Sequence, residues 1–301
     1  MATLDVLIPH FRDPAGLAKS LCSIATQNWT GNLRVLVLDD GSSEGVFSQV
    51  QKTVERFPRA ISLLRNEENV GRPKARNRLL AASDAPYIAW LDAGDTWHVD
   101  KLRIQFEHLR RLEYTGCDIH RVWITCHYQW IVEGAKPRMR HQKIEGDQLE
   151  SLLIGDDLRA YLWTLLGRRE AFQAAGLFDE QLLRLQDLDF FIRFVRAGGN
   201  IEVPPARVPL CDYYKSDVGR DHVQVSKSAE RIFQKNRSIY EKYGQDFVNR
   251  ALWKNARLSA RFANHNNARG ASIYYLLRGA MRVPRFIVQR IHHRIFARFS
   301  K

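Results

Sequence analysis

The chain has 301 residues, of which 45% are hydrophobic and 26% charged, a globular composition that excludes a disordered or collagen-like protein. It contains no run of 18 apolar residues, so no membrane-spanning helix is predicted. The first residues, MATLDVLIPHF, show neither a basic leader nor a cleavage motif, so we expect no secretory signal. Four widely spaced cysteines without a C-x-x-C pair favour reduced thiols in a cytoplasmic protein over a zinc site.

The net charge of +13 is concentrated at one end of the chain. Residues 247–301 hold twelve Lys and Arg and no Asp or Glu, whereas residues 1–246 hold 34 basic and 33 acidic residues. A nearly neutral body therefore carries a strongly cationic tail. Such tails bind anionic surfaces, namely nucleic acid, acidic lipid or an acidic partner.

The first hundred residues alternate between strand-like and helix-like patterns. Strands are predicted at 5–8, 33–40, 61–64 and 87–91, and helices at 14–27, 46–57, 73–82 and near 102–109. This order predicts an α/β fold, with helices on both faces of a mostly parallel sheet. Ligands of such sheets bind beyond the carboxyl ends of the strands, which here are rich in acidic residues and glycine.

The rest of the chain is expected to complete the sheet and then become helical. Residues 117–133 are typical of a long strand or hairpin, and helices are predicted near 169–175 and 187–197. A proline-rich connector at 203–210 predicts the end of a sheet domain covering 1–210. The basic extension, 211–301, is predicted to hold helices at 226–243, 246–263, 269–283 and 285–299.

Neither the G-x-G-x-x-G fingerprint nor a P-loop is present, which argues against a dehydrogenase or an NTPase. Instead, the second strand is followed by Asp39-Asp40-Gly41-Ser42-Ser43. A carboxylate there is either part of a turn and helix cap or the acceptor for the N3–H of uracil or thymine.

A dense basic segment opens the third predicted helix. Asn69-Val70-Gly71-Arg72-Pro73-Lys74-Ala75-Arg76-Asn77 places several cations at a helix N-terminus, where they oppose the helix dipole. A bound anion would account for them, and Arg76 is the best candidate to reach a diphosphate.

Two carboxylates lie three residues apart after the fourth strand, in Leu91-Asp92-Ala93-Gly94-Asp95. The pair either holds a hard cation that binds phosphate oxygens, or Asp95 only caps the next helix.

Taken together, these motifs resemble glycosyltransferase family 2, whose members have the nucleotide-diphospho-sugar transferase (GT-A) fold. The resemblance covers residues 4–112 and resumes in a late block that includes Gly176-Leu177-Phe178-Asp179-Glu180 and Gln186-Asp187-Leu188-Asp189. It implies a nucleotide-sugar-binding half at 1–112 and an acceptor half at 113–210. Each motif alone is weak, but their order along the chain is specific.

The resemblance also implies roles for individual residues. The positions matching the donor site are Pro9 and Phe11 beside the base, Asp40 at the pyrimidine, Asn69, Gly71 and Arg76 near the diphosphate, and Asp92. Asp187 matches the family's general base, which takes the proton of the acceptor hydroxyl.

Three departures from the family pattern are visible. Gly94 replaces the second acid of D-x-D, Gln186 replaces the Glu before Asp187, and His10-Phe11-Arg12 replaces the usual small-Tyr-Asn. We therefore expect only a weak requirement for Mn²⁺ or Mg²⁺, with Asp92, Asp95 and His222 as the candidate ligands.

The implied activity is inverting transfer from a UDP- or dTDP-sugar to a hydroxyl of a cell-surface glycan or glycolipid, such as lipopolysaccharide core, O-antigen or capsule. The tail supports location at the inner face of the cytoplasmic membrane. Its predicted apolar stripes, Tyr274-Leu277-Met281 and Val288-Ile291-Ile295-Phe299, adjoin arginines and no acids, which suits an anionic lipid surface. Packing of these helices on the catalytic domain is the alternative.

Two other functions remain open at this point. Gly94 and Gln186 are compatible with a non-catalytic nucleotide-sugar-binding protein, although Asp187 argues against one. The basic tail is compatible with nucleic-acid binding, but no nucleic-acid motif accompanies it, so no nucleic-acid partner is expected.

Overall fold

The computed structural model describes residues 2–155, 157–214 and 221–288. The chain divides into two compact units, one made of residues 1–180 and 187–216 and the other of residues 181–186 and 217–301. The first unit contains both sheets, and the second is helical. Each unit is described separately.

A seven-stranded, mostly parallel sheet forms the centre of the first unit, as predicted. Its strands follow the order β10 (Asn200–Glu202), β6 (Val122–Ile124), β9 (Leu166–Arg168), β4 (Tyr87–Trp90), β1 (Thr3–His10), β2 (Asn32–Asp40) and β3 (Ala60–Asn66). Only β9 runs antiparallel to its neighbours. The two expected halves of the domain therefore share one sheet, because β6, β9 and β10 extend the sheet built by the first hundred residues.

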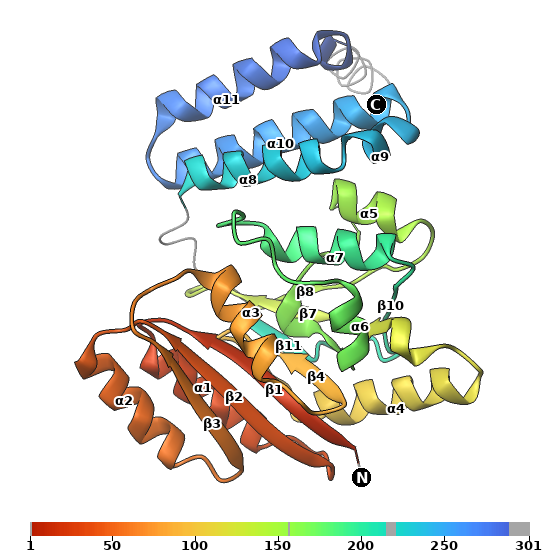
Figure 1. Cartoon of the computed structure of the whole chain (residues 1–301). Helices are drawn as coiled ribbons and strands as arrows, with labels where there is room; N and C mark the ends of the chain where they lie inside the picture. The colour runs from red at the N-terminus through yellow and green to blue at the C-terminus, as the bar shows by residue number, and fades with distance from the viewer. Residues whose placement is uncertain (1, 156, 215–220, 289–301) are drawn as a thin grey trace. The chain divides into compact units, whose positions relative to one another are not determined.

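Helices cover both faces of this sheet (Figure 1). They are α1 (Pro14–Ala25), α2 (Glu44–Glu55), α3 (Arg72–Ala82), α4 (Lys101–Tyr114), α5 (Gln148–Ile154), α6 (Arg169–Ala174) and α7 (Gln186–Arg196), with short 3₁₀ turns η1 (Ile119–Arg121) and η2 (Leu162–Thr164). Alternate side chains of β1 point to opposite faces. Leu4, Val6 and Ile8 join a cluster with residues of α1, whereas α3 packs on the other side.

A second sheet corrects two expectations. Its order is β5 (Thr96–Trp97), β11 (Cys211–Tyr214), β7 (Tyr128–Ile131) and β8 (Arg138–Arg140). The run at 117–133 is not one strand or hairpin, since it divides into β6 and β7, which belong to different sheets. The helical extension also does not begin at 211, because β11 pairs with β5 and β7 in the sheet unit.

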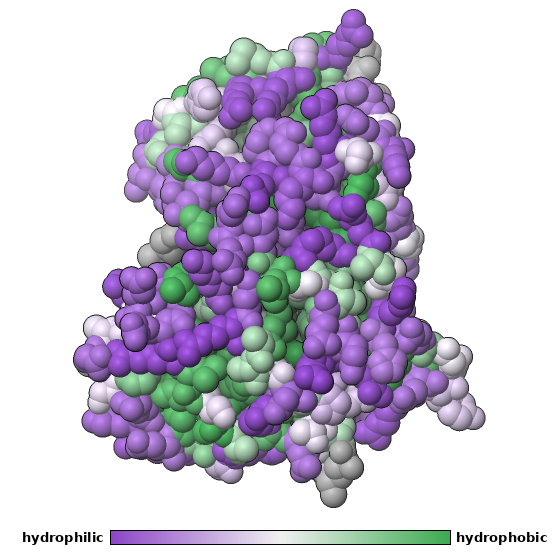
Figure 2. Space-filling view, in the orientation of Figure 1, coloured by the Kyte–Doolittle hydropathy of each residue, from purple (hydrophilic) through white to green (hydrophobic). Residues whose placement is uncertain are grey.

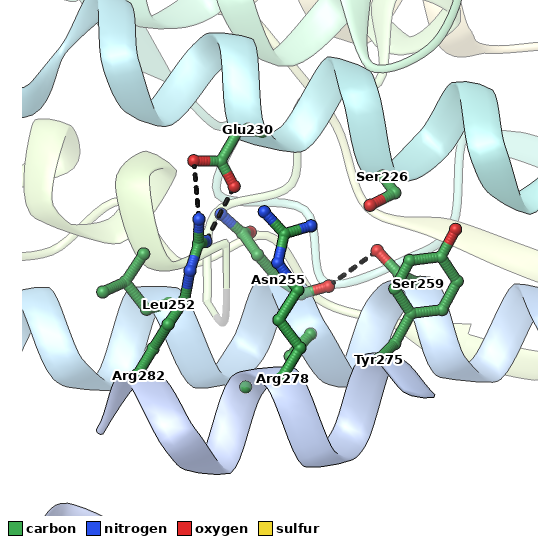
Figure 3. A pocket seen from close by; sticks show the side chains of 10 residues that line it. Ser226, Glu230, Leu252, Asn255, Ser259, Tyr275, Arg278 and Arg282 are labelled. Atoms are coloured by element: carbon green, nitrogen blue, oxygen red, sulfur yellow. Dashed lines mark hydrogen bonds and ion pairs between the residues drawn. The ribbon is translucent and has the colours of Figure 1, made fainter. Parts of the chain in front are cut away.

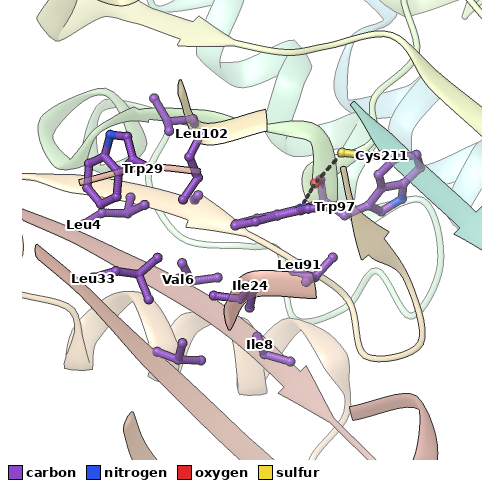
Figure 4. Close-up of a cluster of buried hydrophobic side chains, with 14 of the residues drawn as sticks. Leu4, Val6, Ile8, Ile24, Trp29, Leu33, Leu91, Trp97, Leu102 and Cys211 are labelled. Carbon is purple, nitrogen blue, oxygen red and sulfur yellow. Dashed lines mark hydrogen bonds between the residues drawn. The ribbon is translucent and has the colours of Figure 1, made fainter. Parts of the chain in front are cut away.

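The main hydrophobic core joins the two sheets (Figure 4). Leu4, Val6, Ile8 and Leu33 from the large sheet share it with Trp97 and Cys211 from the second. Trp97 donates its indole N–H to the carbonyl of Trp163 at 3.3 Å. The turn at Asp92–Asp95 connects β4 to β5. Leu91 and Trp97, on either side of this turn, belong to the core, so the core fixes the position of the turn.

The second unit contains α8 (His222–Lys235), α9 (Arg237–Lys242), α10 (Gln245–His265) and α11 (Arg269–Arg282). The helix predicted at 226–243 is two helices, α8 and α9, with Asn236 between them. Gly279 of α11 lies so close to α10 that a Cβ there would stand 2.4 Å from the Cβ of Ala256. The helix α11 is therefore a packed part of the unit.

The outer side of α11 is apolar. Leu277 and Met281 are 60% and 73% exposed, and Tyr274 is 56% exposed. Figure 2 shows hydrophobic surface along this helix, at the top of the view. Most of the helix predicted at 285–299 lies outside the described residues, which end at Val288.

No helix among the described residues is long and apolar enough to cross a bilayer.

A small pocket lies among α8, α10 and α11 (Figure 3). Glu230 and Arg282 form an ion pair at its edge, with a shortest contact of 2.8 Å. Its cavity volume of about 30 Å³ is too small for a nucleotide sugar, because pockets for small ligands measure about 300–1,000 Å³.

Candidate active site

Arg76 joins the two carboxylates that the sequence singles out for chemistry. Its guanidinium donates through Nη2 to Asp92 Oδ1 and Oδ2 at 3.0 and 3.3 Å, and through Nη1 to Asp187 Oδ1. The arginine side chain is fully buried, whereas Asp92 and Asp187 are 25% and 21% exposed. Burial lowers the pKa of Arg76, but its two carboxylate partners outweigh this effect and raise the pKa. Arg76 is therefore a permanent cation between two accessible acids.

Three elements bring this group together. Arg76 lies on α3, Asp92 follows β4, and Asp187 lies in the first turn of α7. A helix N-terminus stabilises negative charge, so the first turn of α7 suits a carboxylate. The ring of Phe178 lies below the guanidinium, with Arg76 Cζ 5.4 Å from the ring centroid.

Asn77 and Arg193 hold the segment around Phe178 in place through hydrogen bonds to its backbone. Asn77 accepts from the Phe178 N–H at 2.7 Å and donates to the Phe178 carbonyl at 3.1 Å. Arg193 donates to the carbonyls of Ala175 and Leu177 and pairs with the buried Asp189. The block that begins at Gly176 thus places the ring of Phe178 against the Arg76 guanidinium.

Ser20 was not foreseen as part of the site. It is fully buried on α1, and its hydroxyl donates to the Asp95 carbonyl at 2.7 Å and accepts from the Gly94 N–H at 3.0 Å. One indication of this role was visible in the sequence, because Ser20 lies between Leu17 and Leu21 on the apolar face of α1, where a polar residue needs a buried partner.

Gly94 has a backbone reason to replace the family's second acid. Its φ is +100°, a region that side chains rarely adopt. The turn from Asp92 to Asp95 is therefore shaped for glycine.

Asp95 does not face the same way as Asp92. It is 5% exposed, and its Oδ1 accepts from the Tyr214 N–H on β11 at 3.0 Å. Burial, with the charge of Asp92 as a further cause, raises the pKa of Asp95 well above its usual range. Asp92 is the more exposed of the two carboxylates, so it is better placed than the buried Asp95 to bind a cation.

His222 is the first residue of α8 and belongs to the helical unit. Its Nδ1 lies 3.2 Å from Asn266 Oδ1. Among the described residues no group of three or more His, Cys, Asp or Glu side chains could hold a metal ion. The ligand set Asp92, Asp95 and His222 stays a prediction.

The Asp39–Ser42 turn is tied to β1. His10 Nε2 accepts from the Asp13 N–H at 3.1 Å, so its Nδ1 is the nitrogen that donates to Asp39 Oδ1, at 2.7 Å. Asp39 also accepts from the hydroxyl and the N–H of Ser42. The unusual His10 therefore has a structural partner in the first Asp of the motif.

Asp40 points to the loop before α3. Its carboxylate accepts from Asn66 Nδ2 at 2.7 Å and from the Val70 and Gly71 N–H groups at 3.1 and 3.0 Å, while Asn69 Nδ2 donates to its carbonyl. About one of the four acceptor positions of a carboxylate is left for a base. The role of Asp40 at a pyrimidine stays a prediction.

Gly41 allows this arrangement, because a Cβ there would stand 2.2 Å from the backbone carbon of Glu68. Phe11 is 39% exposed near the same strand end, and Arg12 lies 4.6 Å from its ring centroid. Pro9, at the end of β1, pairs with Leu38 in the register with β2.

The remaining cations of the basic segment separate into two groups. Arg78 donates to the carbonyl of Arg65 at 2.7 Å, whereas Arg72 and Lys74 are exposed at the start of α3. Because Arg76 is buried, Arg72 and Lys74 are the cations of this segment that an anion can reach most easily. The sequence alone did not show which of these cations are exposed.

The model of the glycosyl transferase family 2 matches residues 5–172, more than half of the chain, and the chain belongs to this family. It is a nucleotide-sugar glycosyltransferase of EC class 2.4. It is 28% identical to the amylovoran biosynthesis glycosyltransferase AmsB of Erwinia amylovora over 216 residues, which are 70% of this chain and 69% of the relative. It is 35% identical to the putative teichuronic acid biosynthesis glycosyltransferase TuaG of Bacillus subtilis over 106 residues, 35% of this chain and 41% of the relative.

Two solved structures share the fold. S. aureus TarS residues 1–349 in complex with UDP-GlcNAc has a TM-score of 0.59 at 14% identity, covering 94% of this chain and 92% of that one. The mannosyltransferase PcManGT of Pyrobaculum calidifontis, in complex with GDP-Man and Mn²⁺, has a TM-score of 0.59 at 18% identity, covering 92% and 79%. These likenesses show the GT-A fold expected from the sequence.

Proposed function

We propose that the protein is an inverting transferase that moves a sugar from a UDP- or dTDP-sugar to a hydroxyl of a growing cell-surface polysaccharide or glycolipid. The observation that carries this proposal is the single guanidinium of Arg76 between Asp92 and Asp187. In this proposal Asp92 is the acid on the donor side and Asp187 the acid on the acceptor side, and Arg76 binds them through different nitrogens.

Asp187 is the proposed general base. Arg76 occupies its Oδ1, and no described residue donates to Oδ2, so that oxygen is available to the acceptor hydroxyl. The base takes the proton as the hydroxyl oxygen attacks C1 of the donor sugar and the nucleoside diphosphate leaves from the opposite side. Fixing Asp187 by a buried partner lowers the cost of orienting it at each turnover.

The exposed Arg72 and Lys74 support the donor side, where they bind the diphosphate, with the charge of Arg76 behind them. The base lies between Phe11 and Asp40. The residues also fit a divalent cation held by one protein carboxylate, Asp92, since Mg²⁺ commonly binds one or two carboxylates together with substrate phosphates. A bound cation would stabilise the negative charge of the leaving diphosphate.

A polysaccharide or glycolipid acceptor is supported by the relatives, whose names refer to amylovoran and teichuronic acid biosynthesis. An acceptor held at the inner face of the cytoplasmic membrane would agree with the cationic C-terminal segment and the exposed apolar side of α11.

The test is a screen of UDP-, dTDP- and GDP-sugars by thermal shift and by donor hydrolysis, with and without Mn²⁺. We expect the largest stabilisation with one uridine or thymidine donor, and slow release of its sugar to water. Stabilisation by the GDP-sugar alone would contradict the assignment of a pyrimidine donor, and no response to any donor would contradict the proposed function.

A further inference from the structure

The second sheet carries a basic edge beside aromatic rings. Lys136, Arg138, Arg140 and Lys143 lie on or next to the edge strand β8, and no acidic residue occurs between Glu133 and Glu145. Lys143 pairs with Asp157 at 3.0 Å. No described carboxylate lies within ion-pair distance of the other three cations. Among the described residues, this edge therefore carries more positive than negative charge.

The arginines share a face of the sheet with aromatic residues. Arg138 lies opposite Trp130, and Trp130 lies opposite Tyr213, so one row crosses β8, β7 and β11. Arg140 covers the ring of Trp130, with its Cζ 4.0 Å from the centroid. Tyr161 stacks on Tyr213 at 5.9 Å between centroids. Trp130, Tyr161 and Tyr213 are all half-buried, at the margin of the hydrophobic core.

A further arginine is fixed against this edge. Gln142, which is buried, donates to the Arg159 carbonyl at 2.9 Å and accepts from the Arg159 N–H at 2.9 Å. Burial raises the pKa of the Tyr128 hydroxyl, and the charges of Arg159 and Arg140 partly oppose this effect. The Arg159 side chain is partly exposed. Two segments distant in sequence thus supply cations to one place.

The row leads to the catalytic turn. The residue after Tyr213 is Tyr214, whose N–H donates to Asp95 at 3.0 Å. Neighbouring strands lie about 4.8 Å apart, so the row from β11 to β8 spans about 10 Å, comparable with two sugar rings. Aromatic faces stack on the apolar faces of sugar rings, and arginines form charge-assisted hydrogen bonds with carboxylate or phosphate oxygens.

From this we infer that Arg138, Arg140 and Arg159, with Trp130 and Tyr213, form an acceptor subsite for an acidic glycan that carries a carboxylate or phosphate one or two sugars from the reacting hydroxyl. The inference rests on the proposed transferase function and specifies its acceptor class.

The experiment measures binding of three trisaccharides to the full-length protein by isothermal titration calorimetry: trigalacturonate, its neutral methyl ester, and maltotriose bearing a phosphate. We expect an acidic trisaccharide to bind at least about 10-fold more tightly than the neutral ester, and the comparison of the two acids identifies the preferred group. Arg138→Gln, Arg140→Gln and Arg159→Gln should each weaken acidic binding about 3- to 10-fold, whereas Trp130→Ala should weaken binding of acidic and neutral trisaccharides alike.

Arg110→Gln is the matched control, because it removes an equal charge from an exposed position on α4. Equal affinity for acidic and neutral trisaccharides, or an equal loss with Arg110→Gln, would overturn the inference. So would binding of phosphatidylglycerol vesicles that the three arginine variants abolish while trisaccharide binding is unchanged. Donor hydrolysis is measured on the same samples. If the wild type hydrolyses the donor but binds acidic and neutral trisaccharides equally, only the acceptor class is refuted. If the wild type neither binds nor hydrolyses any donor, the proposed function is refuted.

Discussion

Arg76 and Asp187 are separated by 111 positions in the sequence, yet they form a direct ion pair in which the arginine is fully buried. The same guanidinium binds Asp92. A buried cation that loses its partners is costly, so each acid also stabilises the position of the arginine. The position of Asp92 is therefore coupled to that of Asp187, the proposed general base, through one residue.

Arg76→Lys should keep the charge but lose this coupling. An ammonium group cannot reproduce the planar two-sided contact, so we expect turnover to fall by about 10²-fold and the free energy of unfolding by about 1–3 kcal/mol. Steady-state kinetics and urea unfolding measure the two effects. Arg103→Lys, on the exposed side of α4, is the control and should change neither. Wild-type turnover in Arg76→Lys would show that the shared contact is dispensable.

Gly94→Asp tests why the D-x-D motif is incomplete. The substitution restores the family's acid, but at a φ of +100° any side chain is strained, at a cost of about 1–3 kcal/mol. We expect a lower melting temperature and no gain in Mn²⁺ affinity. Gly270→Ala, at a position with open space on α11, is the stability control. Tighter Mn²⁺ binding without loss of stability would mean that the turn accepts a second ligand.

Asp95→Asn should stabilise the protein at neutral pH. The raised pKa of Asp95 means that the folded state binds its proton more tightly than the unfolded chain does. Its contribution is therefore most favourable below the unfolded pKa, near 4, and is lost as the pH rises towards the folded pKa. Each tenfold difference in proton affinity corresponds to about 1.4 kcal/mol.

Because asparagine is uncharged and keeps an oxygen for the Tyr214 N–H, we expect a gain of at least about 1 kcal/mol at pH 7.5 and a flatter stability profile between pH 4 and 8. Urea unfolding across this range, with Glu67→Gln at an exposed position as the control, measures it. An unchanged profile would contradict the burial argument.

Much of the fold of the first unit was predictable from the sequence. The alternation of strands and helices over the first hundred residues predicted β1 to β4 and α1 to α4, because local periodicity reports directly on burial. The assignment of residues 117–133 to one strand or hairpin was wrong. An apolar pattern alone does not show that the chain leaves the first sheet at 125–127 and enters the second. The direction in which Asp95 points and the burial of Arg76 depend on β11 and Phe178, contacts that lie far away in the chain.

Membrane association is tested with a chain ending at Val288, because α11 packs on α10 and removing it would expose that helix. In vesicle sedimentation we expect the full chain to bind anionic lipid about 10-fold better than neutral lipid, and less well as salt rises. The shortened chain should bind more weakly, and Leu277→Gln, on the exposed side of α11, should weaken it further. Glu241→Gln, a surface change on α9, is the control. Indifference to lipid charge would favour a purely structural tail.

The most direct test of the central claim compares donor binding and sugar transfer in Asp187→Asn. Asparagine fills the same space beside Arg76, and its amide oxygen still accepts from the guanidinium, so Arg76 keeps a partner on both sides. The amide cannot accept the proton of the acceptor hydroxyl. We predict that affinity for the nucleotide-sugar donor stays within about twofold of the wild type while the transfer rate falls by about 10² to 10⁴. A transfer rate equal to that of the wild type would contradict the assignment of Asp187 as the base.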